Sequence, residues 1–169
     1  MSRRATSKAE SPFAPAPAEA LAVGHLMGRA RASLLSALDA QLAPFGLNGV
    51  QCAVLKYLAD GTARTAADLC RFMHHDNGSM TRILDRLEAK GLLRRERCRE
   101  DRRVVFLRVA PNGRALLPRL LTVASRVVEA HLSGFSNAEV EALKAYLGRM
   151  IDNGRGQGDN APRMTGDGS

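Results

Sequence analysis

Apolar side chains recur at intervals of three and four residues through six segments of this chain, which is the period of an α-helix. The first segment runs from about residue 18 to residue 42, and Pro44 and Gly46 end it. The later segments begin near Asn48, Thr65, Asp76, Pro111 and Ser136. Between the fourth and fifth segments, residues 92–98 and 103–109 have the composition of two short strands. The sequence therefore predicts four helices, a β-hairpin and two further helices.

Several of the predicted helices begin with residues that suit a first helical turn. In three of them a polar residue is followed three positions later by Gln, Asp or Glu, the spacing of a reciprocal capping box. These pairs are Asn48 with Gln51, Thr65 with Asp68, and Ser136 with Glu139. The fourth helix, from Asp76 or Asn77 to Gly91, has one narrow core face composed of Met80, Ile83, Leu84 and Leu87. Its opposite side is therefore expected to face outward.

Composition adds a basic excess to this pattern. The 169 residues include 25 Lys and Arg and 17 Asp and Glu, a formal net charge of +8, which favours a polyanionic partner but does not determine the fold. No apolar run approaches the ~20 residues that cross a bilayer, and the basic N-terminus leads into Pro- and Ala-rich sequence rather than a signal-peptide core. We therefore expect a cytoplasmic protein without a membrane partner.

The three cysteines give no sign of a disulfide framework or a zinc site, because Cys52, Cys70 and Cys98 are widely spaced and include no CxxC pair. His74 and His75 have no carboxylate or thiol at ligand spacing, so contacts with phosphate or solvent suit them better than a metal. We expect neither a metal nor a cofactor. Cys98, in the predicted hairpin, is a hypothesised oxidation-sensitive thiol.

The segment from Thr65 to Val109 carries the most specific pattern. Two short helices with a tight polar turn between them, followed by a hairpin, are typical of a winged helix-turn-helix, whose second helix enters the major groove of DNA. Opposite the core stripe of that helix, the sequence places Ser79, Arg82, Arg86 and Lys90. Short donors near the helix start and arginines further along suit phosphates and base edges. A solvated helix face, with Asp85 and Glu88 interspersed, would show the same pattern.

The hairpin makes this alternative weaker. Residues 94–103 contain six arginines in ten positions. A narrow hairpin with an arginine at its tip fits a minor groove, where the negative potential attracts guanidinium groups. Asp101 is expected to orient a neighbouring arginine. A charged edge hairpin that resists aggregation is the other interpretation, but its place directly after a recognition-like helix favours contact with DNA.

With these residues in place, the chain resembles the MarR family of transcriptional regulators. Residues 81–92, TRILDRLEAKGL, resemble the family's recognition helix and its exit into the wing. Residues 101–103, DRR, and residues 111–116, PNGRAL, resemble the wing and the start of the fifth helix. The resemblance covers about residues 21–151. It implies a mainly α fold with a small β-hairpin wing, in which a winged helix-turn-helix is joined to a helical dimerisation frame.

The resemblance also implies roles for single residues. Asp101 and Arg103 fall on the wing-tip motif, with Arg103 entering the minor groove, and Ser79, Thr81, Arg82 and Arg86 fall on major-groove positions. With the helix start and the other hairpin arginines added, the expected DNA-binding set is Asn77, Ser79, Thr81, Arg82, Arg86, Arg97, Arg99, Asp101, Arg102 and Arg103. Ala110 departs from the family, which usually has a capping Thr there, at a local cost of about 1 kcal/mol.

The resemblance further implies how the chain is organised. Residues 46–110 form the expected DNA-binding domain, and residues 19–45 and 111–151 form the expected dimerisation region. Residues 1–18 and 152–169, rich in small and polar residues, are expected to be disordered. A homodimer would place two recognition helices about one helical turn apart on a palindromic operator in double-stranded DNA. An intramolecular helical cap is the alternative to the dimer.

Relatives often respond to a small aromatic or phenolic effector held between the dimer frame and the DNA-binding domain. His25, Arg29 and Arg31 on the first helix are candidates to meet an anionic effector, and ordinary surface or interhelical polar groups are the other interpretation. Some relatives sense peroxide through a cysteine near the first helix. That mechanism is not supported here, because no cysteine precedes Cys52.

The sequence therefore predicts a sequence-specific DNA-binding regulator, most simply a ligand-responsive repressor. It does not predict an enzyme, because no Ser-His-Asp set, Gly-rich phosphate loop or carboxylate pair is apparent. The alternative is a winged helix used only for contacts with other proteins. Salt separates the two, because each phosphate contact releases counterions and makes DNA affinity fall steeply with salt.

Overall fold

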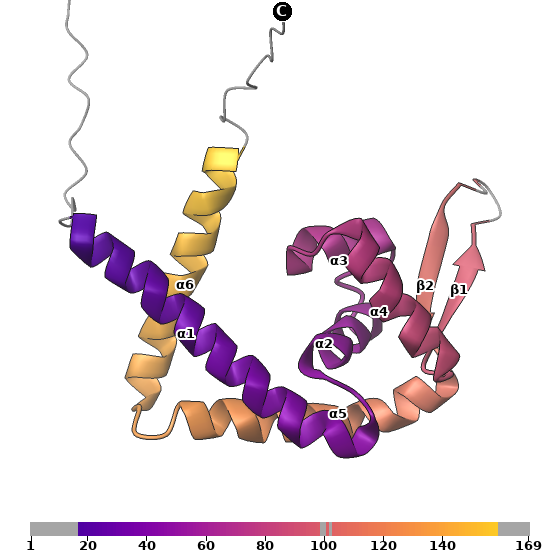
Figure 1. The fold of residues 1–169 in the computed structure, drawn as a ribbon, viewed down its shortest axis with the longest axis horizontal. Helices are drawn as coiled ribbons and strands as arrows, with labels where there is room; N and C mark the ends of the chain where they lie inside the picture. Colours follow the sequence, from indigo (N-terminus) through magenta and orange to yellow (C-terminus); the bar gives the residue numbers. More distant parts are fainter. Residues whose placement is uncertain (1–16, 99–100, 102, 159–169) are drawn as a thin grey trace, which may run out of the picture. The chain divides into compact units, whose positions relative to one another are not determined.

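The computed structural model of the protein describes residues 17–98, 101 and 103–158. Its elements are α1 (Pro17–Leu42), the 3-10 turn η1 (Ala43–Phe45), α2 (Gly49–Ala59), α3 (Ala66–Met73), α4 (Asn77–Ala89), β1 (Leu93–Arg97), β2 (Val105–Val109), α5 (Pro111–His131) and α6 (Asn137–Gly158) (Figure 1). They divide into two compact units, Met1–Val127 and Val128–Ser169, with the division inside α5. The predicted order of four helices, a hairpin and two helices is confirmed.

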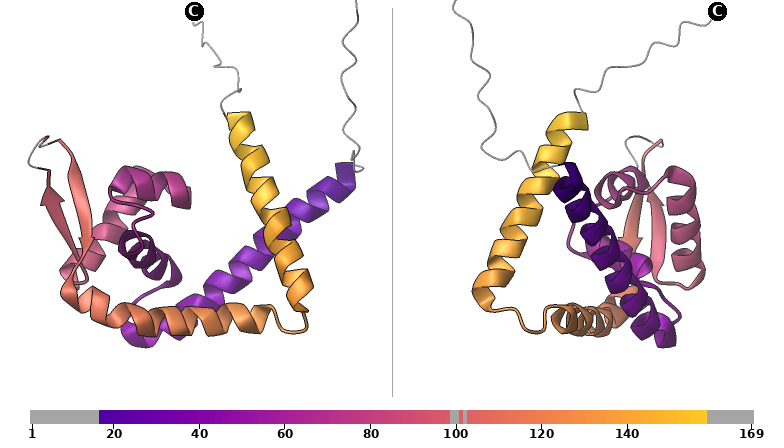
Figure 2. Two further views of the ribbon diagram at one scale, coloured as in Figure 1. Left: turned by 180° about the vertical axis from the view of Figure 1, so that it is seen from behind. Right: turned by 60° about the vertical axis from the view of Figure 1, so that its left-hand side comes forward.

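The first unit is built around one apolar core. Its fully buried side chains come from α1 to α5 and include Leu42, Leu55, Leu69, Met80, Leu84, Leu87 and Leu120. Burying each such side chain contributes roughly 1.5–3 kcal/mol. The stripe predicted for α4 lies in this core. The helix packs against both α3 and β1, and Figure 2 shows these elements from two further sides. Burial of this one stripe therefore turns the opposite side of α4 outward.

The hairpin is a two-stranded antiparallel sheet in which Leu93 pairs with Val109 and Arg97 with Val105. Its strands are shorter than the sequence suggested, because the turn begins at Cys98, whose N–H donates to the Val104 carbonyl (2.9 Å). Leu93, Leu107 and Val109 are buried. By strand alternation they share one face of the hairpin with Arg95 and Arg97. The base of the hairpin thus belongs to the core, and its outer half carries charge.

Local capping accounts for two of the helix starts. The Asn48 side chain accepts from the Gln51 N–H (2.8 Å) while Gln51 accepts from the Asn48 N–H (3.2 Å). Ser136 and Glu139 form the same reciprocal pair at the start of α6. Both predicted capping boxes are confirmed. Each depends only on two residues three positions apart, which is why the sequence alone could predict it.

The second unit consists of the end of α5 and α6. The helix continues to Gly158, beyond the end at Ile151 that the sequence suggested. The apolar periodicity that predicts the helix ends at Ile151, but the Gly and Asn residues that follow lower helix propensity without preventing helix formation. Apolar side chains stay exposed on α6, among them Tyr146 (59%) and Ile151 (54%). None of the helices in the described part of the chain has the length and apolar character needed to cross a membrane.

The two-unit division differs from the organisation expected from the sequence, which grouped residues 19–45 with residues 111–151. Here α1 and the first part of α5 fall in the same unit as the helix-turn-helix elements. Two hydrogen bonds join α1 and the turn after it to the helix-turn-helix elements. The Gly49 N–H donates to the Asp39 carboxylate (2.7 Å), and the Lys90 ammonium donates to the Gly46 carbonyl. The boundary near residue 46 remains a prediction.

The start of α5 is packed so tightly that it requires glycine. A Cβ on Gly113 would lie 2.3 Å from the Leu92 carbonyl oxygen and 2.8 Å from Val109 Cγ1. We expect Gly113→Ala to lower the free energy of unfolding by about 1–3 kcal/mol, because the backbone of Leu92 must move. Urea unfolding followed by circular dichroism measures this change. Gly154→Ala is the control, since a Cβ there meets nothing within 4 Å; equal stability of the two variants would contradict the packing argument.

Candidate nucleic-acid interface

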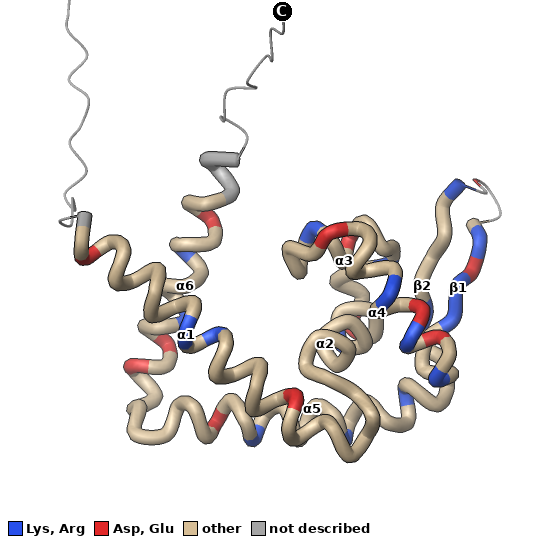
Figure 3. Tube along the Cα trace, in the orientation of Figure 1, with Lys and Arg blue, Asp and Glu red and all other residues tan. Residues whose placement is uncertain are grey.

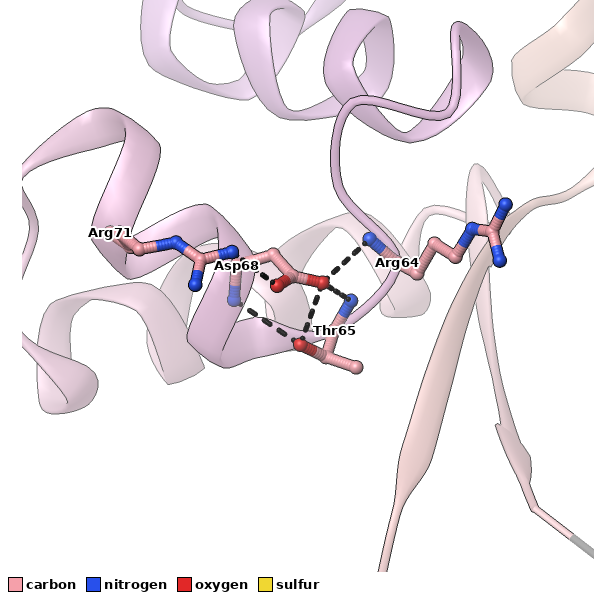
Figure 4. A network of polar contacts seen from close by, with 4 residues as sticks. All are labelled: Arg64, Thr65, Asp68 and Arg71. Atoms are coloured by element: carbon pink, nitrogen blue, oxygen red, sulfur yellow. Dashed lines mark hydrogen bonds and ion pairs between the residues drawn. The ribbon is translucent and has the colours of Figure 1, made fainter.

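A network of polar contacts fixes the start of α3 (Figure 4). The Asp68 carboxylate accepts from the Arg64 and Thr65 backbone N–H groups, both at 3.0 Å, and Arg71 forms an ion pair with it at 3.0 Å. The Thr65 hydroxyl oxygen accepts in turn from the Asp68 N–H (3.2 Å). The N–H donors of Arg64 and Thr65 and the charge of Arg71 hold the pKa of Asp68 below its usual value. The third predicted capping box is confirmed.

The turn between α3 and α4 sets where α4 begins. His74 ends α3 in the left-handed region (φ 52°), and its N–H donates to the Cys70 carbonyl. Asp76 is the N-cap of α4, and its carboxylate accepts from the Ser79 N–H (2.8 Å). This bond lowers the pKa of Asp76. Asp76 rather than Asn77 is therefore the cap, and Asn77 is the first residue of α4.

The outward side of α4 carries the predicted groove-facing residues, but not all of them equally. Arg82 and Arg86 are exposed, and their side chains make no hydrogen bond or ion pair with any described residue. Thr81 is exposed and its hydroxyl donates to the Asn77 carbonyl (2.8 Å). Ser79 is half-buried, and Lys90 is bound to Gly46. Arg82 and Arg86 are thus the two cations that α4 presents outward.

Asn77 lies at the N-terminal end of α4, next to α3. Its side-chain oxygen accepts from the Cys70 thiol, with the sulfur and oxygen 3.3 Å apart. Asn77 is otherwise exposed, so this contact ties an outward residue of α4 to α3. Sequence patterns gave no sign of this pair, because Cys70 and Asn77 belong to different helices.

The acidic residues of α4 do not neutralise these arginines. Asp85 and Glu88 both bind Arg95 of β1, whose guanidinium lies 2.7 Å from the Asp85 carboxylate and also contacts Glu88. The alternative of a solvated helix face rests on Asp85 and Glu88 lying among the arginines of this helix. In the structure both acids pair with Arg95 of β1, and neither forms an ion pair with Arg82 or Arg86.

The described arginines of the hairpin fall into two groups, those that form an ion pair with a carboxylate and those that do not. Glu96 binds both Arg94 (2.8 Å) and Arg108 (3.3 Å), on the face of the hairpin that does not carry Arg95. Arg97 and Arg103 are exposed and have no ion pair with a described residue. Figure 3 marks basic positions along both α4 and β1. Four exposed cations, Arg82, Arg86, Arg97 and Arg103, are therefore available for an external anion.

At the wing tip, Asp101 acts on the backbone rather than on a guanidinium. Its carboxylate accepts from the Arg103 N–H (2.9 Å), and its carbonyl accepts from the Val104 N–H (3.0 Å). This turn fixes where Arg103 leaves the hairpin. Two members of the expected DNA-binding set, Arg99 and Arg102, lie outside the described residues.

The candidate effector residues are all exposed on α1. His25 and Arg29 are one helical turn apart and share a face, whereas Arg31 follows Arg29 by two residues and points to another side. The three therefore do not form one cluster on this helix. Among the described residues, no group of His, Cys, Asp and Glu side chains could hold a metal ion.

Comparison with known proteins shows that the chain is similar to DNA-binding transcriptional regulators. A model of the MarR family matches residues 45–104. The transcriptional repressor NicR of Pseudomonas putida is 26% identical over 136 residues, which cover 80% of this chain and 86% of NicR. BpsR of Bordetella bronchiseptica, whose DNA binding is regulated by 6-hydroxynicotinic acid, has 28% identity and a TM-score of 0.70 over 77% of this chain and 98% of its own.

A third comparison supports the fold alone. The chain matches E. coli MarR in complex with operator DNA with a TM-score of 0.71 and 23% identity. The match covers 79% of this chain and 96% of that one. The predicted mainly helical winged-helix class is therefore confirmed.

Asp68 makes the stability of this region depend on pH. A carboxyl group whose pKa is lowered by folding stabilises the protein above its unfolded pKa, and this contribution is lost as the pH falls through the folded pKa. We expect Asp68→Asn to lower the free energy of unfolding at neutral pH by about 1 kcal/mol. The difference from wild type should shrink as the pH falls below about 4.

Chemical denaturation at a series of pH values measures this dependence. Glu141→Gln is the control, because Glu141 is an exposed carboxylate of α6 that binds Lys144 (2.8 Å). A difference for Asp68→Asn that stays constant with pH would show that the Asp68 charge does not stabilise α3.

Proposed function

We propose that the chain, which is similar to transcriptional regulators of the MarR family, binds a palindromic operator in double-stranded DNA and represses transcription there. The recognition helix is α4, which enters the major groove, and the β1–β2 hairpin is the wing, which reaches the adjacent minor groove. A bound protein blocks RNA polymerase by occupying the promoter. Such a regulator works in the cytoplasm, where the chromosome lies.

One observation carries this proposal. Arg82 and Arg86 on α4 and Arg97 and Arg103 on the hairpin are exposed without a carboxylate partner among the described residues, while Arg94, Arg95 and Arg108 are held by one. A charged edge hairpin that only prevents aggregation gives no reason for this division. Phosphates and guanine edges do, because guanidinium groups bind them in paired hydrogen bonds. The remaining members of the predicted set, Asn77, Ser79 and Thr81, lie in the first turns of α4.

The proposal includes a homodimer. Both α1 and α6 expose large apolar side chains, including Leu21 (75%) and Leu26 (60%) on α1 and Tyr146, Met150 and Ile151 on α6. Apolar patches of this kind on a single chain mark contact surfaces. A second copy that covers them also supplies the second recognition helix that a palindrome requires.

The proposal also includes an effector. DNA binding of the relative BpsR is regulated by 6-hydroxynicotinic acid, an aromatic carboxylic acid. The cationic side chains Arg29 and Arg31, with His25, give α1 a charge that suits such an anion. An effector that binds the DNA-free conformation more tightly than the DNA-bound one lowers operator affinity.

We expect Arg82→Ala and Arg103→Ala each to weaken binding to a duplex that the full chain selects from a random pool by about 1–3 kcal/mol. Arg82→Ala should also reduce discrimination against mismatched duplexes, because major-groove contacts carry base information. Both variants should keep the wild-type melting temperature, because neither side chain makes a hydrogen bond or ion pair with the rest of the described chain. Fluorescence anisotropy titration and thermal unfolding measure the two quantities.

Arg126→Ala is the control, since Arg126 is an exposed arginine of α5 and its loss removes the same charge. Titrations at several salt concentrations should show affinity falling steeply, with a log–log slope of about −0.9 per phosphate contacted. The stoichiometry should be two chains per duplex. Binding that is insensitive to salt would favour a module that contacts only proteins, whereas wild-type affinity in both variants would show that Arg82 and Arg103 do not contact the DNA.

We expect 6-hydroxynicotinic acid to raise the melting temperature of the full chain and to weaken its operator binding, because an effector stabilises the state that it binds. Arg29→Gln should reduce both effects while leaving DNA affinity without the acid unchanged. Differential scanning fluorimetry over a series of acid concentrations provides the measurement, with benzoic acid as a second probe. If Arg29→Gln responds like the wild type, Arg29 does not bind the effector.

A further inference from the structure

Arg95 joins the hairpin to the recognition helix by charge. Its guanidinium lies between two carboxylates of α4, at 2.7 Å from Asp85 and in contact with Glu88. Asp85 and Glu88 are three residues apart, so they lie next to each other on one side of the helix. Arg95 is half as exposed as the neighbouring Arg94, at 32% against 60% of the side chain.

The position of this pairing along the hairpin gives it a mechanical role. Leu93, at the base of β1, is anchored in the core, and Arg95 is the next residue on the same face. Arg97 follows on that face without a partner among the described residues. The ion pairs therefore lie between the buried base of the wing and its DNA-facing end.

We propose that Arg95, Asp85 and Glu88 form a bracket that fixes the wing relative to the recognition helix, so that both meet one duplex in register. This inference rests on the proposed function, and it makes Arg95 a positioning residue that acts through Arg97 and Arg103. A guanidinium suits this role because its planar fork reaches two acceptors in fixed directions, which an ammonium cannot.

The charges on α4 support this role. A carboxylate on a helix that faces DNA repels phosphates, so Asp85 and Glu88 oppose binding unless they perform another task. Exposed ion pairs contribute little when each is isolated. Here two carboxylates share one cation, so the two ion pairs act on the same strand residue. The position of that residue matters because a small rotation of the wing about its base moves Arg97 and Arg103, at the far end of the hairpin, much further than Leu93 at the base.

The first test compares two adjacent arginines of β1. Arg95→Ala and Arg94→Ala remove the same charge, but Arg94 is paired with Glu96 on the other face of the hairpin and forms no ion pair with a described residue of α4. We expect Arg95→Ala to lower affinity for the selected duplex about tenfold, comparable to the loss of one base-pair contact, and Arg94→Ala to lower it much less. Hydroxyl-radical footprints should lose minor-groove protection in Arg95→Ala alone, while guanine N7 protection by α4 remains.

The second test uses the sign of an effect. The double variant Asp85→Asn with Glu88→Gln removes two negative charges next to the DNA, so simple electrostatics predicts tighter binding to every duplex. The bracket predicts that affinity for a random duplex rises while affinity for the selected duplex falls, so that the specificity ratio drops. A rise in affinity for both duplexes would overturn the bracket, as would equal losses in Arg94→Ala and Arg95→Ala.

A measurement without DNA separates this inference from the proposed function. Hydrogen exchange of the β1–β2 amides in the free full chain should be faster in Arg95→Ala than in the wild type and in Arg94→Ala. The melting temperature of the protein should be the same in all three. Unchanged exchange contradicts the bracket. If the wild type selects no duplex, the proposed function fails, and the exchange measurement still decides whether Arg95 holds the wing.

Discussion

The arrangement of this surface depends on the burial of one narrow apolar stripe of α4. Met80, Leu84 and Leu87 lie in the core of the first unit, and their side of the helix can face no other way. The Asp76 cap fixes where the helix begins, and therefore which residues occupy its outward side. A helix with a broader apolar surface could rotate about its axis, but a narrow stripe sets one orientation. The outward position of Arg82 and Arg86 follows from packing alone.

A second constraint comes from the carboxylates. The net charge of +8 favours a polyanionic partner but gives no location for it. The location emerges only when the ion pairs are assigned. Glu96 holds Arg94 and Arg108, and the two acids of α4 hold Arg95. Within α4 and the hairpin, the described arginines without such partners are Arg82 and Arg86 on the helix and Arg97 and Arg103 on the outer half of the hairpin. Acidic residues thus select which basic residues remain available for DNA.

The sequence predicted those features that depend on neighbours a few residues apart. All three capping boxes and the α4 stripe are local patterns, and the structure confirms them. Contacts between distant residues were missed. The bond from Lys90 to the Gly46 carbonyl joins residues 44 apart, so the helix pattern that places Lys90 opposite the core stripe gives no sign of it. Arg95 was one of six similar arginines, and only the register of the hairpin shows that it faces α4. Side-chain chemistry alone does not identify a partner when several carboxylates are available.

This division separates the residues that determine stability from those that determine recognition. Arg82, Arg86, Arg97 and Arg103 contribute no hydrogen bond or ion pair from their side chains to the described part of the fold. Their replacement changes the surface at little expense to folding, because exposed positions without partners tolerate substitution. The caps at Thr65 and Asp76 and the glycine at residue 113 have the opposite character. Such a scaffold can acquire a new operator by exchange of a few surface residues, while the packed stripe of α4 keeps them in position.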